Sequence, residues 1–303
     1  MKSLKVVILE SILDDINVQM REGDKFVKST IKDFLKANFK HASTCKISRR
    51  PNSDGKYVVD AQKIEVKNNY IKSLTNENFV WGTVKEFFSC AWCNSLTTLE
   101  GAPEEVGSFN CSNCNSLTSL KGAPKKVANT FNCSDCKSLT SLEGAPKEVG
   151  GFFTCSSCNS LTSLKGAPKK AENFSCNSCK SLTSLEGAPK KVGEDFFVNF
   201  CDSLKDLKGA TQDVGRDFSC IGCKSLTSLE GAPEIIKHCF YCNNCNYLTS
   251  LKGAPKKVMY IFDCSNCKSL SSLEGAPEVG YRFICKNCNS LTAREGAPKF
   301  ADF

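Results

Sequence analysis

The stretch NCSNCNSLTSLKGAP, residues 110–124, decides how this chain folds. It contains Cys111-x-x-Cys114, and a near copy returns at Cys133-x-x-Cys136. Two CxxC pairs at this separation are typical of a zinc site. The same stretch also holds two leucines in the run SLTSL, which a zinc site does not require. It is therefore either a metal knuckle or one rung of a repeating solenoid whose cysteines are core side chains.

The pattern recurs ten times from residue 87 to the C-terminus, at intervals of 21 or 22 residues. Its consensus is F-x-C-x-x-C-x-S-L-T-S-L-(E/K)-G-A-P-x-x-V, and the phenylalanine, the second cysteine, the first leucine and Gly-Ala never vary. We number the rungs one to ten by the second cysteine, which is Cys93, Cys114, Cys136, Cys158, Cys179, Cys201, Cys223, Cys245, Cys267 and Cys288. A unit this short cannot bury its own apolar residues, whereas stacked copies can.

Each rung has a predicted strand and a predicted turn. The F-x-C run places its Phe and Cys on the same side of a short strand, and the second cysteine and both leucines point into the same core around a bend. Gly-Ala-Pro then breaks the regular backbone and turns the chain. The pattern therefore predicts a mainly β solenoid of ten rungs.

The run FTCSSCNSLTSLKGAPKK, residues 153–170, resembles a short leucine-rich repeat. Phe153, Cys155, Cys158 and Leu161 fall in the slots of the L-x-L-x-x-(N/C)-x-x-L strand, and CNSLTSL is similar to the bacterial surface-antigen type of that repeat. The resemblance covers residues 87–303 and implies a right-handed leucine-rich-repeat-like solenoid. It departs from common versions in using cysteine at two positions and Gly-Ala-Pro on the return side.

The cysteines have a packing interpretation and a metal interpretation. Val198 replaces the first cysteine of rung six, where it fills a core slot but cannot bind a metal, and no histidine stands near it. Buried free thiols are therefore the favoured interpretation. Zinc held by the four thiolates named above remains the alternative. Disulfides also stay open, because a rung spacing of about 4.8 Å lies within the permitted Cα range.

The residue before Gly-Ala alternates in charge through nine rungs, from Glu100 and Lys121 to Glu274, and the alternation fails only at Glu295. Stacked rungs bring equivalent side chains to about 5 Å, where opposite charges attract and like charges repel. We therefore expect a Glu/Lys ladder that fixes the register. Inheritance from a duplicated two-rung ancestor also explains the alternation.

Residues 1–86 precede the array and are predicted to cap it. Residues 1–40 have the apolar spacing of two amphipathic helices, which either belong to the cap or form a separate docking segment. Residues 41–86 are predicted to form a β hairpin and a degenerate rung, so the cap is a small α+β unit and residues 87–303 are the solenoid. In that rung Val66, Ile71, Leu74 and Val84 are placed in the Phe, second Cys, Leu and Val slots. These four assignments follow from spacing alone.

The C-terminus shows no dedicated cap. Arg294, Glu295 and the tail of residues 300–303 are expected to blunt the exposed end. The alternative is that this end pairs with another chain, which would make the protein an oligomer.

No catalytic constellation is present, so an enzyme is not predicted. The chain lacks GxSxG, a phosphate-binding glycine loop and HExxH. Its two histidines, His41 and His238, lie far apart. Cys239, beside His238, is the one candidate reactive thiol, and a chance cysteine at a rung edge is the simpler explanation.

The predicted functional residues are apolar side chains at positions that are small and polar in the other rungs. Exposed aromatic residues on a regular scaffold are the usual anchors of protein interfaces. We therefore predict a protein partner, bound mainly at Phe197, Phe200 and Tyr241. The full candidate set is Trp92, Phe197, Phe200, Ile221, Tyr241 and Tyr247.

Charge and targeting signals narrow the remaining classes. The net charge is +8, and acidic residues such as Glu104 and Asp213 interrupt the lysine pairs that follow the prolines, so a nucleic-acid partner is not favoured. The chain shows no membrane-spanning run and no export signal, which predicts a cytoplasmic protein with reduced thiols and no cofactor. The other open classes are a thiolate-rich zinc protein and a surface adhesin or phage-borne host-interaction protein.

Overall fold

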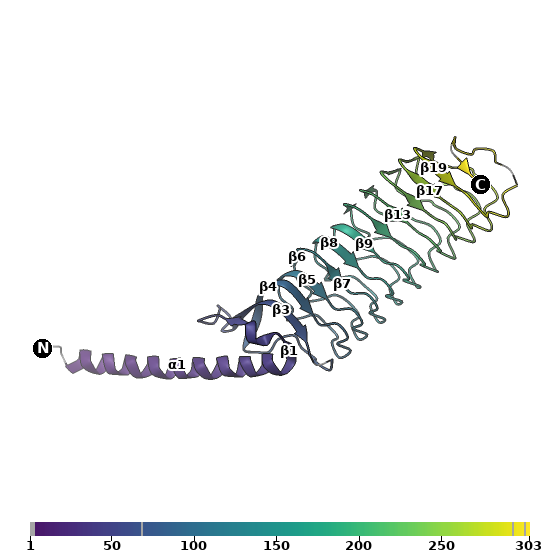
Figure 1. Ribbon diagram of the computed structural model, residues 1–303. Coiled ribbons are helices and arrows are strands. Elements are labelled where there is room, and N and C mark those ends of the chain that lie inside the picture. Colours follow the sequence, from purple (N-terminus) through teal and green to yellow (C-terminus); the bar gives the residue numbers. More distant parts are fainter. Residues whose placement is uncertain (1–3, 68, 293, 300) are drawn as a thin grey trace.

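The computed structural model describes residues 4–67, 69–292, 294–299 and 301–303, and their side chains from residue 21 onward. The chain is mainly β and forms a β-solenoid of about 11 turns with a helix at its N-terminus. Figure 1 shows the turns stacked along one axis, with the helix extending away from the first turns and the C-terminus at the far end.

One helix, α1 (Leu4–Asn38), replaces the two helices that were expected. The run REGD at residues 21–24, which would separate the two helices, contains Gly23 and lies inside the single helix. A glycine in a helix interior costs only about 1 kcal/mol relative to alanine, which is too little to end a helix that is held at one end by packing. That end is the C-terminal one, where Ile31 and Leu35 are buried and the Phe34 ring lies 5.8 Å from the Phe79 ring.

The predicted hairpin and degenerate rung follow the helix. The elements are β1 (Phe39–Lys40), the 3-10 turn η1 (Ala42–Thr44), β2 (Lys46–Ile47), β3 (Tyr57–Val66) and β4 (Phe79–Ser89). Strand β3 pairs antiparallel with β1 and β2 and parallel with β4, so it joins the hairpin to the stack. Ile71, Leu74 and Val84 are buried as predicted.

The register corrects one assignment in the degenerate rung. Ile64 pairs with Phe88, so it occupies the slot that was assigned to Val66, and Val66 pairs instead with Phe39. The sequence spacing predicted the wrong residue for this slot, because the pairing of β3 with β4 is irregular between residues 59 and 63 of β3. This irregularity shifts the slots by two residues. Phe39 and Trp81 are buried here and extend the aromatic core into the cap.

Each rung then contributes two short segments. Each segment pairs in parallel with the equivalent segment of the neighbouring rung. The segment that ends at the valine slot, called the valine strand, lies in β6 (Lys126–Val127), β10 (Lys191–Val192), β12 (Asp213–Val214), β14 (Ile235–Ile236), β16 (Lys257–Val258) and β18 (Glu278–Val279). The segment at F-x-C, called the phenylalanine strand, lies in β7 (Phe131–Asn132), β11 (Phe196–Phe197), β13 (Phe218–Ser219), β15 (Phe240–Tyr241), β17 (Ile261–Asp263) and β19 (Arg282–Ile284). The two are continuous in β5 (Glu105–Asn110), β8 (Glu148–Thr154) and β9 (Lys170–Ser175).

The ten consensus phenylalanines form one buried column along the axis. Neighbouring ring centroids are 5.2–5.6 Å apart, and most rings are nearly parallel. The exception is rung six, where the Phe196 ring is tilted by 36° against Phe174 and by 57° against Phe218. This is also the rung in which Val198 replaces a cysteine and Thr211 replaces a proline, and the Thr211 hydroxyl donates to the Pro189 carbonyl at 2.6 Å.

The glycine of Gly-Ala-Pro permits both the turn and the close stacking of rungs. Gly122 has φ +85°, and the Ala123 N–H donates to the Leu120 carbonyl to close the turn. A Cβ at Gly122 would lie 2.3 Å from the backbone nitrogen of Glu100 in the preceding rung. Only glycine meets both demands, which explains why it is present in every rung.

In rungs two to ten the second cysteine donates a hydrogen bond to the rung before it. In rung four the Cys158 thiol donates to the Cys133 carbonyl at 3.2 Å. The same bond, at 3.1–3.3 Å, is made by Cys114, Cys136, Cys179, Cys201, Cys223, Cys245, Cys267 and Cys288. A buried carbonyl without a partner is costly, and in rungs three to ten this thiol supplies a donor where no backbone N–H bond is made. The Cys90 carbonyl, which accepts the Cys114 thiol, also accepts the Cys93 N–H at 3.3 Å.

The first cysteine has a different role, which explains why Val198 is tolerated. The Cys155 thiol lies 3.7 Å from the Ser175 carbonyl, but that carbonyl already accepts the Cys155 backbone N–H at 2.9 Å. Val198 keeps the equivalent backbone bond, to the Ser219 carbonyl at 2.8 Å. The first cysteine is therefore mainly a packing residue, and a valine of similar shape replaces it without an unpaired polar group.

The expected Glu/Lys ladder is present as ion pairs between rungs. Lys121 pairs with Glu100 at 3.0 Å, Lys165 with Glu186 at 3.5 Å, and Lys208 with Glu230 at 3.2 Å. The side chains are well exposed, so each pair contributes at most about 1 kcal/mol. The ladder therefore acts on register rather than on stability.

The C-terminus is better covered than the sequence suggested. Strand β20 (Ala301–Asp302) pairs parallel with β19 on rung ten. Asp302 forms ion pairs with Arg282 and Lys286, and the Arg294 guanidinium lies 4.2 Å from the centre of the Phe303 ring. Phe300, which was assigned to the blunting tail, lies outside the described residues. Expected pairing of this end with another chain stays a prediction.

The two cysteine columns should respond differently to the same substitution. We expect Cys155→Val to leave the urea midpoint nearly unchanged, because only packing is exchanged. Cys158→Val should lower the free energy of unfolding by about 1–3 kcal/mol, because it leaves the Cys133 carbonyl unpaired. Circular dichroism during urea titration measures both. Cys158→Ser, which keeps a donor, should fall between them, and equal effects of the two valine variants would contradict the assignment.

Candidate interaction surface and polar cluster

Phe197 and Tyr241 lie in one column on the outer face of the phenylalanine strands. Phe197 pairs with Ser219, and Ser219 pairs with Tyr241, so the two aromatic side chains lie on either side of a serine on rungs six and eight. Both aromatic residues are half-buried, and Ser219 is buried between them. Phe197 and Tyr241, which are two rungs apart in the sequence, therefore lie close together in space.

Phe200 and Trp92 occupy a column in which the backbone is left-handed. Their φ values are 58° and 66°. The other rungs place short polar residues or glycine there, namely Asn113, Asp135, Ser157, Ser178, Gly222, Asn244, Asn266 and Asn287. Such φ values favour glycine, asparagine and aspartate and strain a bulky side chain. Phe200 is 53% and Trp92 57% exposed, so neither gains full burial in exchange for this strain.

The Phe200 ring lies across the next rung, over Gly222. A Cβ at Gly222 would be 2.6 Å from the Cδ1 atom of this ring. Glycine at position 222 is therefore complementary to the phenylalanine at position 200. Ile221, next to it, is half-buried.

The structure brings four of the six predicted residues onto three successive rungs. We call Phe197, Phe200, Ile221 and Tyr241 the strand-face patch. Trp92 lies on rung one, about 24 Å away at the usual strand spacing, and so belongs to a different part of the surface.

Tyr247 is also exposed, and it follows Cys245 in the bend of rung eight. It is therefore not in the columns that carry the patch. The prediction of a partner-binding role for any of the six residues remains a prediction.

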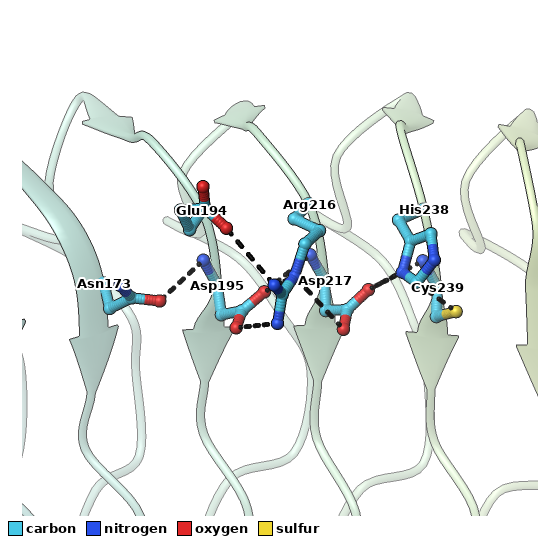
Figure 2. Close-up of polar contacts among 7 residues, drawn as sticks. All are labelled: Asn173, Glu194, Asp195, Arg216, Asp217, His238 and Cys239. Carbon is cyan, nitrogen blue, oxygen red and sulfur yellow. Dashed lines mark hydrogen bonds and ion pairs between the residues drawn. The ribbon is translucent and has the colours of Figure 1, made fainter.

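A polar cluster lies beside the patch, on the segments that lead into the phenylalanine strands of rungs six to eight (Figure 2). Asp217 Oδ1 is 2.7 Å from His238 Nδ1 and also accepts the Cys239 backbone N–H at 2.9 Å. The Cys239 sulfur lies 3.3 Å from the same His238 nitrogen. Cys239 is 1% exposed, and burial raises the pKa of its thiol. It is thus a buried residue and not a surface cysteine at the rung edge.

This arrangement does not fit a Cys–His–Asp catalytic triad. In such a triad the carboxylate and the nucleophile contact opposite nitrogens of the imidazole, so that the ring can relay a proton. Here the Asp217 oxygen and the Cys239 sulfur approach the same nitrogen, Nδ1 of His238. Figure 2 shows both contacts meeting at one corner of the ring.

Arg216 neutralises part of the acidic charge next to this cluster. Its guanidinium binds Asp195 in a bidentate manner, with nitrogen–oxygen distances of 2.9 and 2.7 Å, and reaches Glu194 at 3.3 Å (Figure 2). Hydrogen bonding to Asp195 raises the pKa of Arg216. Asp217 lies farther away, with 3.8 Å between its Oδ2 atom and the arginine Nε atom.

An exposed aromatic ladder next to the valine strands was not predicted. The His238 ring stacks on Tyr260 at 4.9 Å, and Tyr260 stacks on Tyr281 at 4.7 Å. Met259 and Ile235 are exposed close by in the sequence. The sequence contains a signal for this ladder, because His238, Tyr260 and Tyr281 each stand two residues after the valine slot.

A groove of about 910 Å³ along the valine strands of the first rungs was also missed. Its lining includes Gly107, Gly150 and Gly193 and several lysines. At Lys191 and Gly193 it reaches the segment that leads into rung six, which is the first rung of the strand-face patch. Glycines outside the Gly-Ala-Pro turns are the sequence signal for it.

The lysine pairs that follow the prolines are compensated by acidic residues of adjacent rungs. Lys125 pairs with Glu104 at 2.6 Å, and Lys256 pairs with Glu234 at 3.1 Å. Lys191 pairs with Asp213 at 3.4 Å. The acidic residues that interrupt the lysine pairs in the sequence therefore form ion pairs with lysines of adjacent rungs.

Burial affects the thiols of the cysteine columns. All 21 cysteines are free in the structure. Burial raises the pKa of Cys133 well above its ordinary value and that of Cys136 to about 12. The Cys136 thiol is directed at the Cys111 carbonyl at 3.2 Å. The alternative zinc ligands thus already have a structural use, although zinc binding to them remains untested.

No family model matches the chain, and neither a curated protein nor a solved structure matches it. Within the described residues, α1 carries no stretch that is apolar and long enough to cross a membrane.

The left-handed position of Phe200 yields a stability prediction. Phe200→Asn should raise the free energy of unfolding by about 0.5–1 kcal/mol, because asparagine adopts this backbone conformation at lower cost. The reverse change in the same column, Asn244→Phe, should lower it by about 1 kcal/mol. Chemical denaturation compares both with the parent chain. A loss of stability in Phe200→Asn would mean that packing of the ring on Gly222 outweighs the backbone strain.

Proposed function

We propose that this protein is a non-enzymatic interaction scaffold that binds a protein partner through the strand-face patch. The observation that carries the proposal is Phe200, a half-exposed aromatic ring at a backbone position that other rungs give to small polar residues or glycine. Strain of this kind is retained where function uses it. A ring that costs stability and stays accessible is best explained by contact with another molecule.

The surroundings of Phe200 support a protein partner. Phe197, Ile221 and Tyr241 add apolar surface on neighbouring rungs, and the small, buried Ser219 lies between the two aromatic residues of its column. Aromatic anchors surrounded by small polar residues are typical of interface hot spots. The stacked rungs hold these side chains on a rigid frame, which reduces the entropy lost on binding.

The scaffold proposal includes a relation to leucine-rich repeats. It is supported by the strand–turn rungs, by the consecutive buried leucine and cysteine columns and by the motif CNSLTSL. Reduced thiols in a cytoplasmic setting agree with the buried free cysteines. A phage-borne or adhesin role is a special case of the same scaffold, with a host surface protein as the partner.

A thiolate-rich zinc protein is the competing proposal. Repeated CxxC pairs support it, and the hydrogen bonds of the second-column thiols count against it. Metal analysis of protein purified without added zinc separates the two by stoichiometry. The scaffold proposal expects 21 titratable thiols after denaturation and at most one bound metal ion per chain, whereas zinc in the cysteine columns would give several.

A crosslinking pull-down from the native host tests the patch. The variant Phe197→Ala/Phe200→Ala/Tyr241→Ala should reduce recovery of the partner at least about tenfold, which corresponds to the loss of one hot-spot residue. Quantitative mass spectrometry compares this variant with the parent chain.

The matched control removes exposed aromatics elsewhere. Phe26→Ala/Tyr70→Ala changes side chains that are 74% and 81% exposed and should leave recovery unchanged. Melting curves must show that the triple variant remains folded, and Phe200→Ala alone provides a milder variant. Full recovery with a folded triple variant would place the binding site elsewhere, and the lysine-lined groove would be the next surface to change.

A further inference from the structure

Three side chains with metal-binding atoms meet beside the strand-face patch. Ligand atoms of Asp217, His238 and Cys239 all lie within 4.8 Å of one another. Asp217 belongs to rung seven, and the other two belong to rung eight, so the group exists only because the rungs stack in register. Figure 2 shows the Asp217 carboxylate and the Cys239 thiol close to the His238 ring.

One proton on His238 Nδ1 serves only one of the two contacts at that nitrogen. If Nδ1 carries a proton, it donates to Asp217 Oδ1 at 2.7 Å, and the Cys239 sulfur is left to its other partners, Tyr241 and the Ile261 backbone. If Nδ1 is unprotonated, it can accept from the thiol at 3.3 Å, but its lone pair then faces a carboxylate oxygen at 2.7 Å. A cation among the three atoms would satisfy all of them together.

We propose that Asp217, His238 and Cys239 form a binding site for one divalent transition-metal ion of the Zn²⁺ type. Carboxylate, imidazole and thiolate are the three side-chain ligands that zinc uses, and three protein ligands leave a fourth position open. Binding removes the Cys239 proton, which is released to solvent as the sulfur–metal bond forms. This site is separate from the cysteine columns, which keep their structural hydrogen bonds.

The observed separations lie near those of a zinc centre. Around a tetrahedral zinc ion, nitrogen and oxygen ligands are about 3.3 Å apart, and nitrogen and sulfur ligands are about 3.6 Å apart. The distances here are 2.7 Å from His238 Nδ1 to Asp217 Oδ1 and 3.3 Å from His238 Nδ1 to Cys239 Sγ. The imidazole must move away from the carboxylate by about half an ångström, and the Asp217 oxygen and the Cys239 sulfur, which lie within 4.8 Å, must come to about 3.6 Å. The His238 side chain is 45% exposed, so it has room to move.

Charge and support around the three ligands favour a cation. Glu194, Asp195 and Asp217 place three carboxylates against the single guanidinium of Arg216, which is engaged mainly by Asp195. The Cys239 backbone N–H fixes the Asp217 carboxylate. Tyr260 supports one face of the His238 ring. Partners of this kind orient ligands and increase metal affinity.

Titration of the full chain with Co²⁺ and Zn²⁺ tests the proposal. Co²⁺ should produce a thiolate-to-metal charge-transfer band that saturates at one ion per chain, and Zn²⁺ should displace it. Cys239→Ser should abolish the band, and His238→Ala and Asp217→Asn should each weaken zinc binding at least about tenfold in calorimetry. His238→Ala changes a half-exposed ring, so it should not unfold the chain.

The chain offers matched controls, because it has one other histidine and one other cysteine outside the rung columns. His41→Ala and Cys45→Ser should bind Co²⁺ and Zn²⁺ like the parent chain. Absence of any saturable band, or a band that Cys239→Ser and His238→Ala leave unchanged, would overturn the proposal. Equal losses in the control variants would do the same, because they would place the ion elsewhere.

Discussion

The hydrogen bond from the second-column thiol of rungs two to ten to a carbonyl of the preceding rung is the constraint on which the stack depends. The phenylalanine and leucine columns are fully buried, so a core carbonyl without a backbone partner needs a donor among side chains. Cysteine provides a donor in a small, largely apolar side chain. In these nine rungs the second cysteine has this role, whereas the first yields to Val198 in rung six without loss of a polar contact.

Much of the fold follows from periodicity, because one rung determines the others. The phenylalanine column, the turn glycines and the Glu/Lys ladder are consequences of placing equal residues about 5 Å apart. The misassigned features lie where periodicity ends. Gly23 does not divide α1, Ile64 takes the slot given to Val66, and a terminal strand closes rung ten, because packing and local register decide these places.

The candidate sites were predictable to different degrees. Phe197 and Tyr241 could be paired from the sequence, since a separation of two rungs fixes their column. The cluster of Asp217 with His238 and Cys239 was missed because its members were compared along the chain and not between rungs. A shift of one repeat length brings Asp217 beside Cys239, so an alignment of the rungs contains the necessary signal. The side-chain directions that join them at one nitrogen require coordinates.

Rung six interrupts the aromatic column but not the sheet. On either side of it the phenylalanine rings are close to parallel, whereas Phe196 is turned against both of its neighbours. Its strand β11 nevertheless pairs in register with β9 and β13, so the backbone stack continues through it (Figure 1). A solenoid transmits geometry only from one neighbour to the next. The irregularity of this rung therefore stays local, and the sheet tolerates a rung that departs from the consensus without losing its continuity.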